Sequence, residues 1–141
     1  VNGKLEGKYS EYDEKGNIIS QGEFYDDKEE GKWIIHFGDF IEEGSFKEGL
    51  RDGEWKGTYD NGNKAYEVIF HDDNPDGNYK SYWPNGKPKE TGIYILGRKH
   101  GLWQKYDETG ILYLTITYRK GVEMKYDGAK IQPELPESIS D

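Results

Sequence analysis

The chain has no cysteine among its 141 residues, which excludes disulfides, thiolate zinc sites and cysteine nucleophiles. Hydrophobic residues are also scarce at 33%, against roughly 45–50% in ordinary domains on a count that includes glycine, so no thick core is expected. No apolar run approaches the roughly 20 residues that a membrane-spanning helix needs. No signal peptide is visible, but the first residue is Val1 rather than Met, so an exported parent and a cytoplasmic one both stay open.

Basic residues are outnumbered, 19 against 28 acidic ones, for a net charge of −9. This balance disfavours nucleic acid and anionic membranes as partners, because both require a basic footprint. Low hydrophobicity combined with net charge is typical of disorder. The aromatic share of 15% and the 19 glycines argue against disorder. They favour a thin β structure in which aromatic rings supply the burial.

The glycines belong to an internal repeat that begins with Gly-x-aromatic. We call the first glycine position zero. It recurs at spacings of 24, 22, 24 and 24 residues, at Gly7, Gly31, Gly53, Gly77 and Gly101. Position two is then Tyr9, Trp33, Trp55, Tyr79 and Trp103, and position seventeen is Phe24, Phe46, Phe70, Tyr94 and Tyr118, with two residues deleted in the second unit. Five matched units indicate a repeat architecture.

An antiparallel hairpin in which position zero faces seventeen and position two faces fifteen explains the spacing. Its midpoints fall at pairs such as Asn61-Gly62, and Asn-Gly is the preferred two-residue turn since both of its residues need positive φ. In the short unit the same pairing predicts a turn at Gly38-Asp39. An aromatic ring then lies over a facing glycine, for example Trp33 over Gly44.

Alternation along these strands places the aromatic residues on one face and mostly polar residues on the other, interrupted there by Tyr12, Tyr82 and Tyr106. The connections between hairpins are short polar turns that leave no room for a crossover helix. We therefore predict an all-β fold: a single-layer antiparallel meander of about five repeated hairpins, elongated and twisted, over residues 1–128. Residues 129–141, with two prolines and three acids, are expected to form an acidic tail or cap.

The units resemble MORN repeats, in particular the bacterial MORN-variant repeat of proteins described as YwqK-type antitoxin modules. The signature Asn-Gly-Lys with a following Gly-x-aromatic and Tyr is present in "NGKLEGKYSEY" at residues 2–12, in "DNGNK" at 60–64 and in "NGK" at 85–87. The second and fifth units depart from it, because they lack Asn-Gly at the turn. "GVEMKYDG", from Gly121, resembles a sixth unit that decays as a capping strand would.

A search for chemistry finds no catalytic, cofactor or metal motif. His36, His71 and His100 occupy non-equivalent repeat positions, and neither a hydrolase elbow nor a phosphate-binding loop is present. Asp72, Asn74, Asp76 and Gly77 match the first half of a calcium-binding loop. Trp83 stands where that loop requires a bidentate glutamate, so a polar turn between two units is the better interpretation. We expect no enzyme and no cofactor.

Two interpretations of the aromatic face stay open, because it is either the core of the sheet or a groove for a partner. The candidate partner-binding aromatics are Trp33, Trp55, Tyr79 and Trp103, with Tyr79 and Trp103 expected to be the most accessible. Acids in the connections, Asp26, Asp27, Glu29 and Glu30, would steer a basic partner.

The leading function hypothesis is a non-catalytic scaffold for protein–protein interaction. Self-association through open strand edges is an additional expectation. The resemblance implies an alternative, an antitoxin that neutralises a toxin by direct binding. MORN repeats also occur in plant phosphatidylinositol phosphate kinases, but this sequence has no kinase phosphate loop or catalytic lysine, so catalysis of that kind is not expected.

Overall fold

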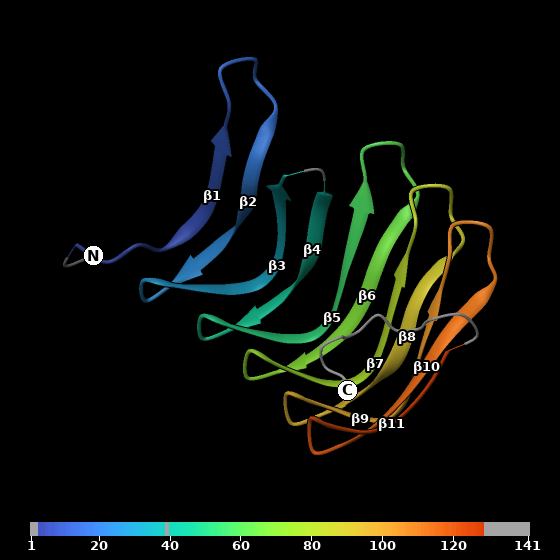
Figure 1. Cartoon of the computed structure of the whole chain (residues 1–141). Helices are drawn as coiled ribbons and strands as arrows, with labels where there is room; N and C mark the ends of the chain where they lie inside the picture. The colour runs from blue at the N-terminus through green and yellow to red at the C-terminus, as the bar shows by residue number, and fades with distance from the viewer. Residues whose placement is uncertain (1–2, 39, 129–141) are drawn as a thin grey trace.

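The computed structural model describes residues 3–38 and 40–128, and within them every regular element is a β-strand. The strands are β1 (Gly7–Tyr12), β2 (Ile18–Tyr25), β3 (Lys28–Phe37), β4 (Phe40–Lys47), β5 (Leu50–Tyr59), β6 (Lys64–His71), β7 (Asn74–Tyr82), β8 (Pro88–Ile95), β9 (Arg98–Tyr106), β10 (Leu112–Arg119) and β11 (Val122–Gly128). They form one antiparallel sheet of 11 strands in sequence order, which is the predicted meander (Figure 1). The described residues contain no helix that could cross a membrane.

The eleventh strand is the decayed sixth unit, which pairs with β10. The tail predicted for residues 129–141 lies outside the described residues. Each unit is one hairpin, so the odd-numbered connections are hairpin loops and the even-numbered ones are junction turns. Figure 1 shows the two kinds at opposite ends of the strands, the hairpin loops at the top and the junction turns at the bottom.

The junction turns are the tight two-residue turns of this fold. Asp26 and Asp27, with φ of 53° and 70°, separate the paired residues Tyr25 and Lys28. The other four junctions follow the same plan, with positive φ at Glu48 and Gly49, Asp72 and Asp73, Leu96 and Gly97, and Lys120 and Gly121. Positive φ at both central residues is the geometry of a type I′ turn, which matches the natural twist of a hairpin.

Successive junction turns are hydrogen-bonded to one another. The second turn residue donates its backbone N–H to a carbonyl near the preceding junction, as in Asp73 to Arg51 at 2.9 Å and Gly97 to Pro75 at 2.8 Å. Side chains strengthen this stack, because the Asp73 carboxylate accepts the Arg51 backbone N–H at 2.8 Å. The junction turns therefore form a continuous hydrogen-bonded row along one end of the strands.

The hairpin loops differ from the prediction, because four of them are longer than a two-residue Asn-Gly turn. The Tyr59 carbonyl accepts the Gly62 N–H at 2.8 Å, while the Tyr59 N–H donates to the Asn63 carbonyl at 2.8 Å. Gly62 has φ 92°, whereas Asn61 is absent from the residues with positive φ. This is a three-residue loop with a glycine bulge. Asn61 stabilises it through side-chain hydrogen bonds and not through a positive φ.

The amide oxygen of Asn61 accepts the Asn63 N–H at 2.8 Å, and its amide nitrogen donates to the Pro84 carbonyl of the next loop at 3.0 Å. Asn85 repeats both bonds, to Lys87 and to the Glu108 carbonyl. In the short unit the pairing of Phe37 with Phe40 leaves only residues 38 and 39 between the strands, as predicted.

The predicted register within each hairpin is confirmed. Gly31 faces Phe46 and Trp33 faces Gly44, and the corresponding pairs recur in the other four units. Between units the ladder contains bulges: Gly53, Glu54 and Trp55 together lie opposite Gly44. Four position-zero glycines belong to these bulges, namely Gly31, Gly53, Gly77 and Gly101. Gly31, for example, has φ 73° with open space where a Cβ would be. They permit a left-handed backbone and are not covered by the facing ring, contrary to expectation.

The position-fifteen glycines do make room for rings, but for rings of the following unit. A Cβ at Gly44 would overlap the indole of Trp55 on β5, not Trp33, and Gly22 and Gly92 lie in the same way under Trp33 and Trp103. The core is thin and consists mainly of these rings. Its buried hydrophobic residues are Trp33, Trp55, Ala65, Val68, Trp103 and Ile116.

Candidate binding surface

One face of the sheet carries the aromatic residues of positions two and seventeen, and we call it the ring face. Its rings meet mostly edge to face, as in Trp33 with Phe24 at 5.2 Å between centroids and Trp55 with Phe46 at 5.1 Å. Such pairs stabilise beyond the area that they bury, by about 0.5–1.5 kcal/mol each. The ring face therefore holds the sheet together.

The two rows of rings differ in exposure. Trp33, Trp55 and Trp103 are only 4%, 0% and 1% exposed, while Tyr79 is half-buried. The expectation that Trp103 would be among the most accessible rings is therefore wrong, because the neighbouring strands and the glycine beneath it enclose the indole. The rings of position seventeen are all half-buried, and they supply the accessible aromatic surface.

Each buried indole also has its N–H satisfied. Trp55 donates to the Ser45 carbonyl at 2.9 Å, Trp33 to Glu23 at 3.0 Å and Trp103 to Ile93 at 3.1 Å. The acceptor is always the residue after the position-fifteen residue of the preceding unit. The hydrogen bond orients the ring over the glycine, and an unsatisfied buried N–H would cost about 1–3 kcal/mol.

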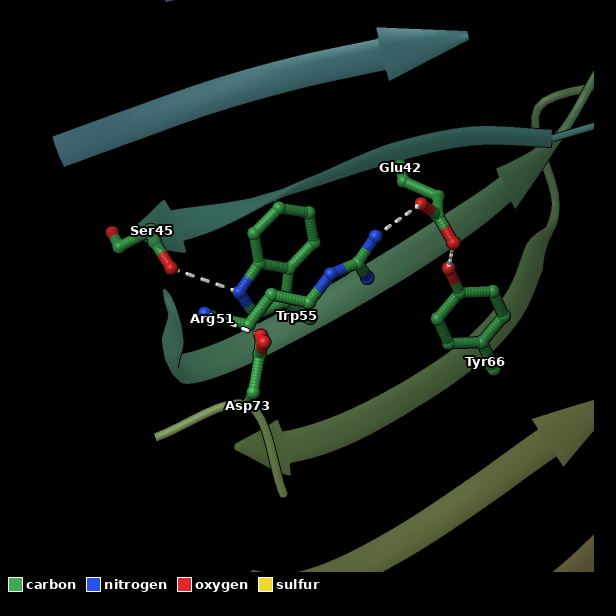
Figure 2. Close-up of polar contacts among 6 residues, drawn as sticks. All are labelled: Glu42, Ser45, Arg51, Trp55, Tyr66 and Asp73. Carbon is green, nitrogen blue, oxygen red and sulfur yellow. Dashed lines mark hydrogen bonds and ion pairs between the residues drawn. The ribbon is translucent and has the colours of Figure 1, made fainter. Parts of the chain in front are cut away.

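A polar cluster covers the ring of Trp55 on the ring face (Figure 2). The Arg51 guanidinium lies 4.3 Å from the centre of that ring and donates to a Glu42 oxygen at 3.3 Å. The Tyr66 hydroxyl donates to the other Glu42 oxygen. Burial, followed by the hydrogen bond to the Glu42 carboxylate, raises the pKa of Tyr66 above its ordinary value, so its phenol stays protonated.

The same arrangement recurs two units later. Lys99 lies 4.7 Å from the centre of the Trp103 ring and 3.9 Å from a Glu90 oxygen. Arg51 and Lys99 both stand four residues before their tryptophan, while Glu42 and Glu90 stand thirteen residues before it. A cation paired with a glutamate thus covers two of the three buried tryptophans. Sequence reasoning missed both clusters, although the two spacings are readable in the sequence.

The opposite face carries lysine and glutamate side chains that form ion pairs. A shallow groove of about 410 Å³ lies among Lys32, Lys56, Lys64, Glu43, Glu54 and Glu67. Lys64 is 2.8 Å from Glu67, and this hydrogen bond lowers the pKa of the Glu67 carboxyl. The face is less polar than predicted, however, because Ile93 and Leu102 on it are 43% and 54% exposed.

The histidines do not gather with one another. His36 lies 3.8 Å from Asp60, whereas His71 lies 3.7 Å from Asp52 and 3.8 Å from Asp72. Asp52, His71 and Asp72 offer ligand atoms within 4.8 Å of one another, but the latter two are exposed and nothing else points to a metal ion there. The segment that resembles half of a calcium loop is a junction turn at Asp72-Asp73 followed directly by β7, so it does not form the loop that such a site needs.

Three of the four junction acids expected to steer a partner have structural roles. Asp26 is 2.8 Å from the Lys4 ammonium, Asp27 accepts the Leu5 N–H at 2.7 Å, and Glu30 accepts the Glu48 N–H at 3.0 Å. The carboxylate of Glu29 has no hydrogen bond or ion pair with the described residues, and it lies on the ring face. Sequence position alone could not distinguish it from its neighbours.

Comparison with protein-family models gives a match to the MORN repeat variant over residues 2–27, 51–72, 75–95 and 99–120, more than half of the chain. The chain belongs to the MORN repeat variant family. The matched stretches omit the short second unit, although β3 and β4 form the same hairpin there. None of the curated proteins matches the chain. The family description names a repeat and no partner, so the antitoxin alternative stays a prediction.

Proposed function

We propose that this MORN repeat variant protein is a non-catalytic scaffold that binds another protein through its ring face. One observation supports the proposal above the others. The sheet is a single layer, and within the described residues no helix or second sheet covers the row of half-buried rings at position seventeen. Uncovered aromatic surface of this kind usually marks an interaction site.

The physical character of the face suits protein recognition. Phe and Tyr rings provide large contact area with few rotatable bonds, and the buried tryptophans hold them rigidly from behind. The net charge of −9 favours a partner with basic groups. The outer edges of β1 and β11 pair with no other strand of the described residues, so they offer backbone hydrogen-bonding groups that a second copy would also bind.

The polar groups on this face support the non-catalytic part of the proposal. Glu42, Arg51 and Tyr66 are bonded to one another over a buried ring, which makes them structural partners. General acid–base catalysis requires a group placed to exchange a proton with a substrate at working pH. The raised pKa of the Tyr66 phenol, which burial causes, makes it a poor base near neutrality.

The test compares neighbouring residues that point to opposite faces. Tyr94 is half-buried on the ring face, while Ile93 is 43% exposed on the other. A photo-crosslinking amino acid at Tyr94 should trap the partner in the source cells, and one at Ile93 should not. With the partner purified, Tyr94→Ser should lower the affinity for it at least tenfold. Ile93→Ser should keep an affinity within twofold of that of the wild type.

Melting curves and near-ultraviolet circular dichroism must show that both variants stay folded. If Ile93→Ser weakens binding and Tyr94→Ser does not, the interface lies on the opposite face and the proposal is refuted. Trp103→Ala is not a suitable variant, since it removes a side chain that is 1% exposed and would damage the core. Turnover of a substrate by the wild-type protein would refute the non-catalytic role.

A further inference from the structure

The groove over Trp33 on the ring face differs from the equivalent places over Trp55 and Trp103. It has a volume of about 320 Å³ and is lined by Trp33, Tyr9, Phe24 and Phe46, with Ser20 and Glu29 among its polar residues. Trp33 is one of the three buried tryptophans, and none of the cations in the described residues lies over its ring, whereas Arg51 and Lys99 cover the other two.

The internal repeat shows what is missing there. Glu29 stands four residues before Trp33, where the other two units carry Arg51 and Lys99. Ser20 stands thirteen residues before Trp33, where those units carry Glu42 and Glu90. In the second unit an acid therefore stands in the position of the cation, and a serine stands in the position of the acid.

The charged residue that lines the groove is acidic, and Arg51, which pairs with the lining residue Phe46, is directed away to Trp55 and Glu42. Besides Glu29, Glu11 lies at its rim, where it accepts hydrogen bonds from Ser20 at 3.4 Å and Tyr9 at 3.3 Å. The register places Leu5, Glu11, Ser20, Glu29 and Ile35 on this part of the ring face, and none of them is basic. A positive charge brought to the groove would meet an aromatic surface and two carboxylates.

From this comparison we infer that the groove over Trp33 receives an arginine side chain of the partner protein. The guanidinium lies against the ring-lined wall as Arg51 lies against Trp55, and it is held by Glu29 with Glu11 at the rim. Arginine fits better than lysine, since its planar guanidinium both stacks on rings and donates to carboxylates. This inference rests on the proposed function and adds to it the chemistry of one anchor residue.

The first experiment uses a small probe in place of the partner. The tripeptide acetyl-Gly-Arg-Gly-amide is titrated into ¹⁵N-labelled protein, and the indole N–H signals of Trp33, Trp55 and Trp103 are followed. We expect a saturable shift at Trp33, and little change at the two tryptophans already covered. The same tripeptide with citrulline in place of arginine, which has nearly the same shape without the charge, should bind at least fivefold more weakly.

Variants then test the residues that form the groove. Glu29→Gln should weaken the probe at least threefold, whereas Glu30→Gln, one residue further on the other face, should leave binding unchanged. The double variant Ser20→Glu/Glu29→Arg rebuilds the covered arrangement and should abolish probe binding while raising the melting temperature. Arg51→Ser should open a second site, seen as a new shift at Trp55 when the probe is added.

The outcomes separate this inference from the proposed function. No shift at Trp33, equal binding of the citrulline peptide, or full binding to the rebuilt double variant would each overturn the arginine pocket. If the purified partner loses affinity with Tyr94→Ser but not with Glu29→Gln, the scaffold proposal stands and the arginine pocket fails. If the probe binds at Trp33 but no ring-face variant changes the affinity for the partner, the scaffold proposal fails instead.

Discussion

Gly44 lies directly beneath the indole ring of Trp55, so that a Cβ at residue 44 would overlap the ring. The two residues belong to neighbouring units, and their contact joins β4 to β5. Where the repeat lacks this glycine, as at Val68, the following unit has Tyr79 in place of tryptophan. The glycine and the tryptophan therefore form one structural unit across the three junctions that have both, those before Trp33, Trp55 and Trp103.

Gly44→Val should destabilise the protein by about 1–3 kcal/mol, because the new side chain forces Trp55 from its place over the strand. Urea denaturation followed by tryptophan fluorescence measures the loss. Ile41→Val, on the opposite face of the same strand and 37% exposed, is the matched control and should change stability by less than about 0.5 kcal/mol.

Combining Gly44→Val with Trp55→Tyr should recover part of that loss, since it reproduces the natural pair of Val68 and Tyr79. The coupling free energy in the double-mutant cycle should be favourable, in the range of about 0.5–3 kcal/mol for residues in contact. The same cycle with Trp33→Tyr should show much weaker coupling. Stronger coupling to Trp33 than to Trp55 would contradict the packing described above.

Arg51→Met should destabilise the protein by about 1–3 kcal/mol. Methionine retains contact with the Trp55 ring but leaves the Glu42 carboxylate, 13% exposed in its side chain, without its ion pair. Thermal denaturation at neutral pH measures the effect. Adding Glu42→Gln to Arg51→Met should restore part of the stability, because it removes the unpaired charge, and no recovery would indicate that the ion pair contributes little.

Tyr66→Phe should lower stability at neutral pH and make it less sensitive to alkali. The folded-state pKa of Tyr66 is raised by burial and by Glu42, so its contribution is fully present below the ordinary value of 10.0 and is lost as pH rises above it. The difference in unfolding free energy between wild type and variant should therefore shrink above about pH 10. A difference that stays constant up to pH 11 would show that Tyr66 titrates normally in the fold.

Asn61→Gly distinguishes the observed loop from a two-residue Asn-Gly turn. In a type I′ turn glycine at that position would be neutral or stabilising. In the observed loop the change removes the bonds to the Asn63 N–H and the Pro84 carbonyl, so we expect a loss of about 1 kcal/mol. Calorimetric melting of this variant beside Asn85→Gly, its equivalent one unit later, should give similar losses.

Much of the fold could be predicted from the spacing of a few residue types. Glycine and aromatic positions recur with a nearly constant period, and the constant sum of facing residue numbers set the register of all five hairpins. The candidate site was harder to predict. Trp33, Trp55 and Trp103 were expected to be binding residues, yet packing between units buries them, and that packing depends on bulges which the hairpin register does not contain.

The sequence by itself determined the period of the repeat, the pairing within each hairpin and the separation of an aromatic face from a charged one. These features depend on residues close together in the chain, where backbone geometry leaves few alternatives. The tertiary structure decided which ring covers which glycine and which tryptophans lie under a cation. It also decided that Glu29, alone among Asp26, Asp27, Glu29 and Glu30, has a carboxylate without a bond to the described residues. Those relationships join neighbouring units through bulged strands, so they follow from the stacking of units and not from the repeat itself.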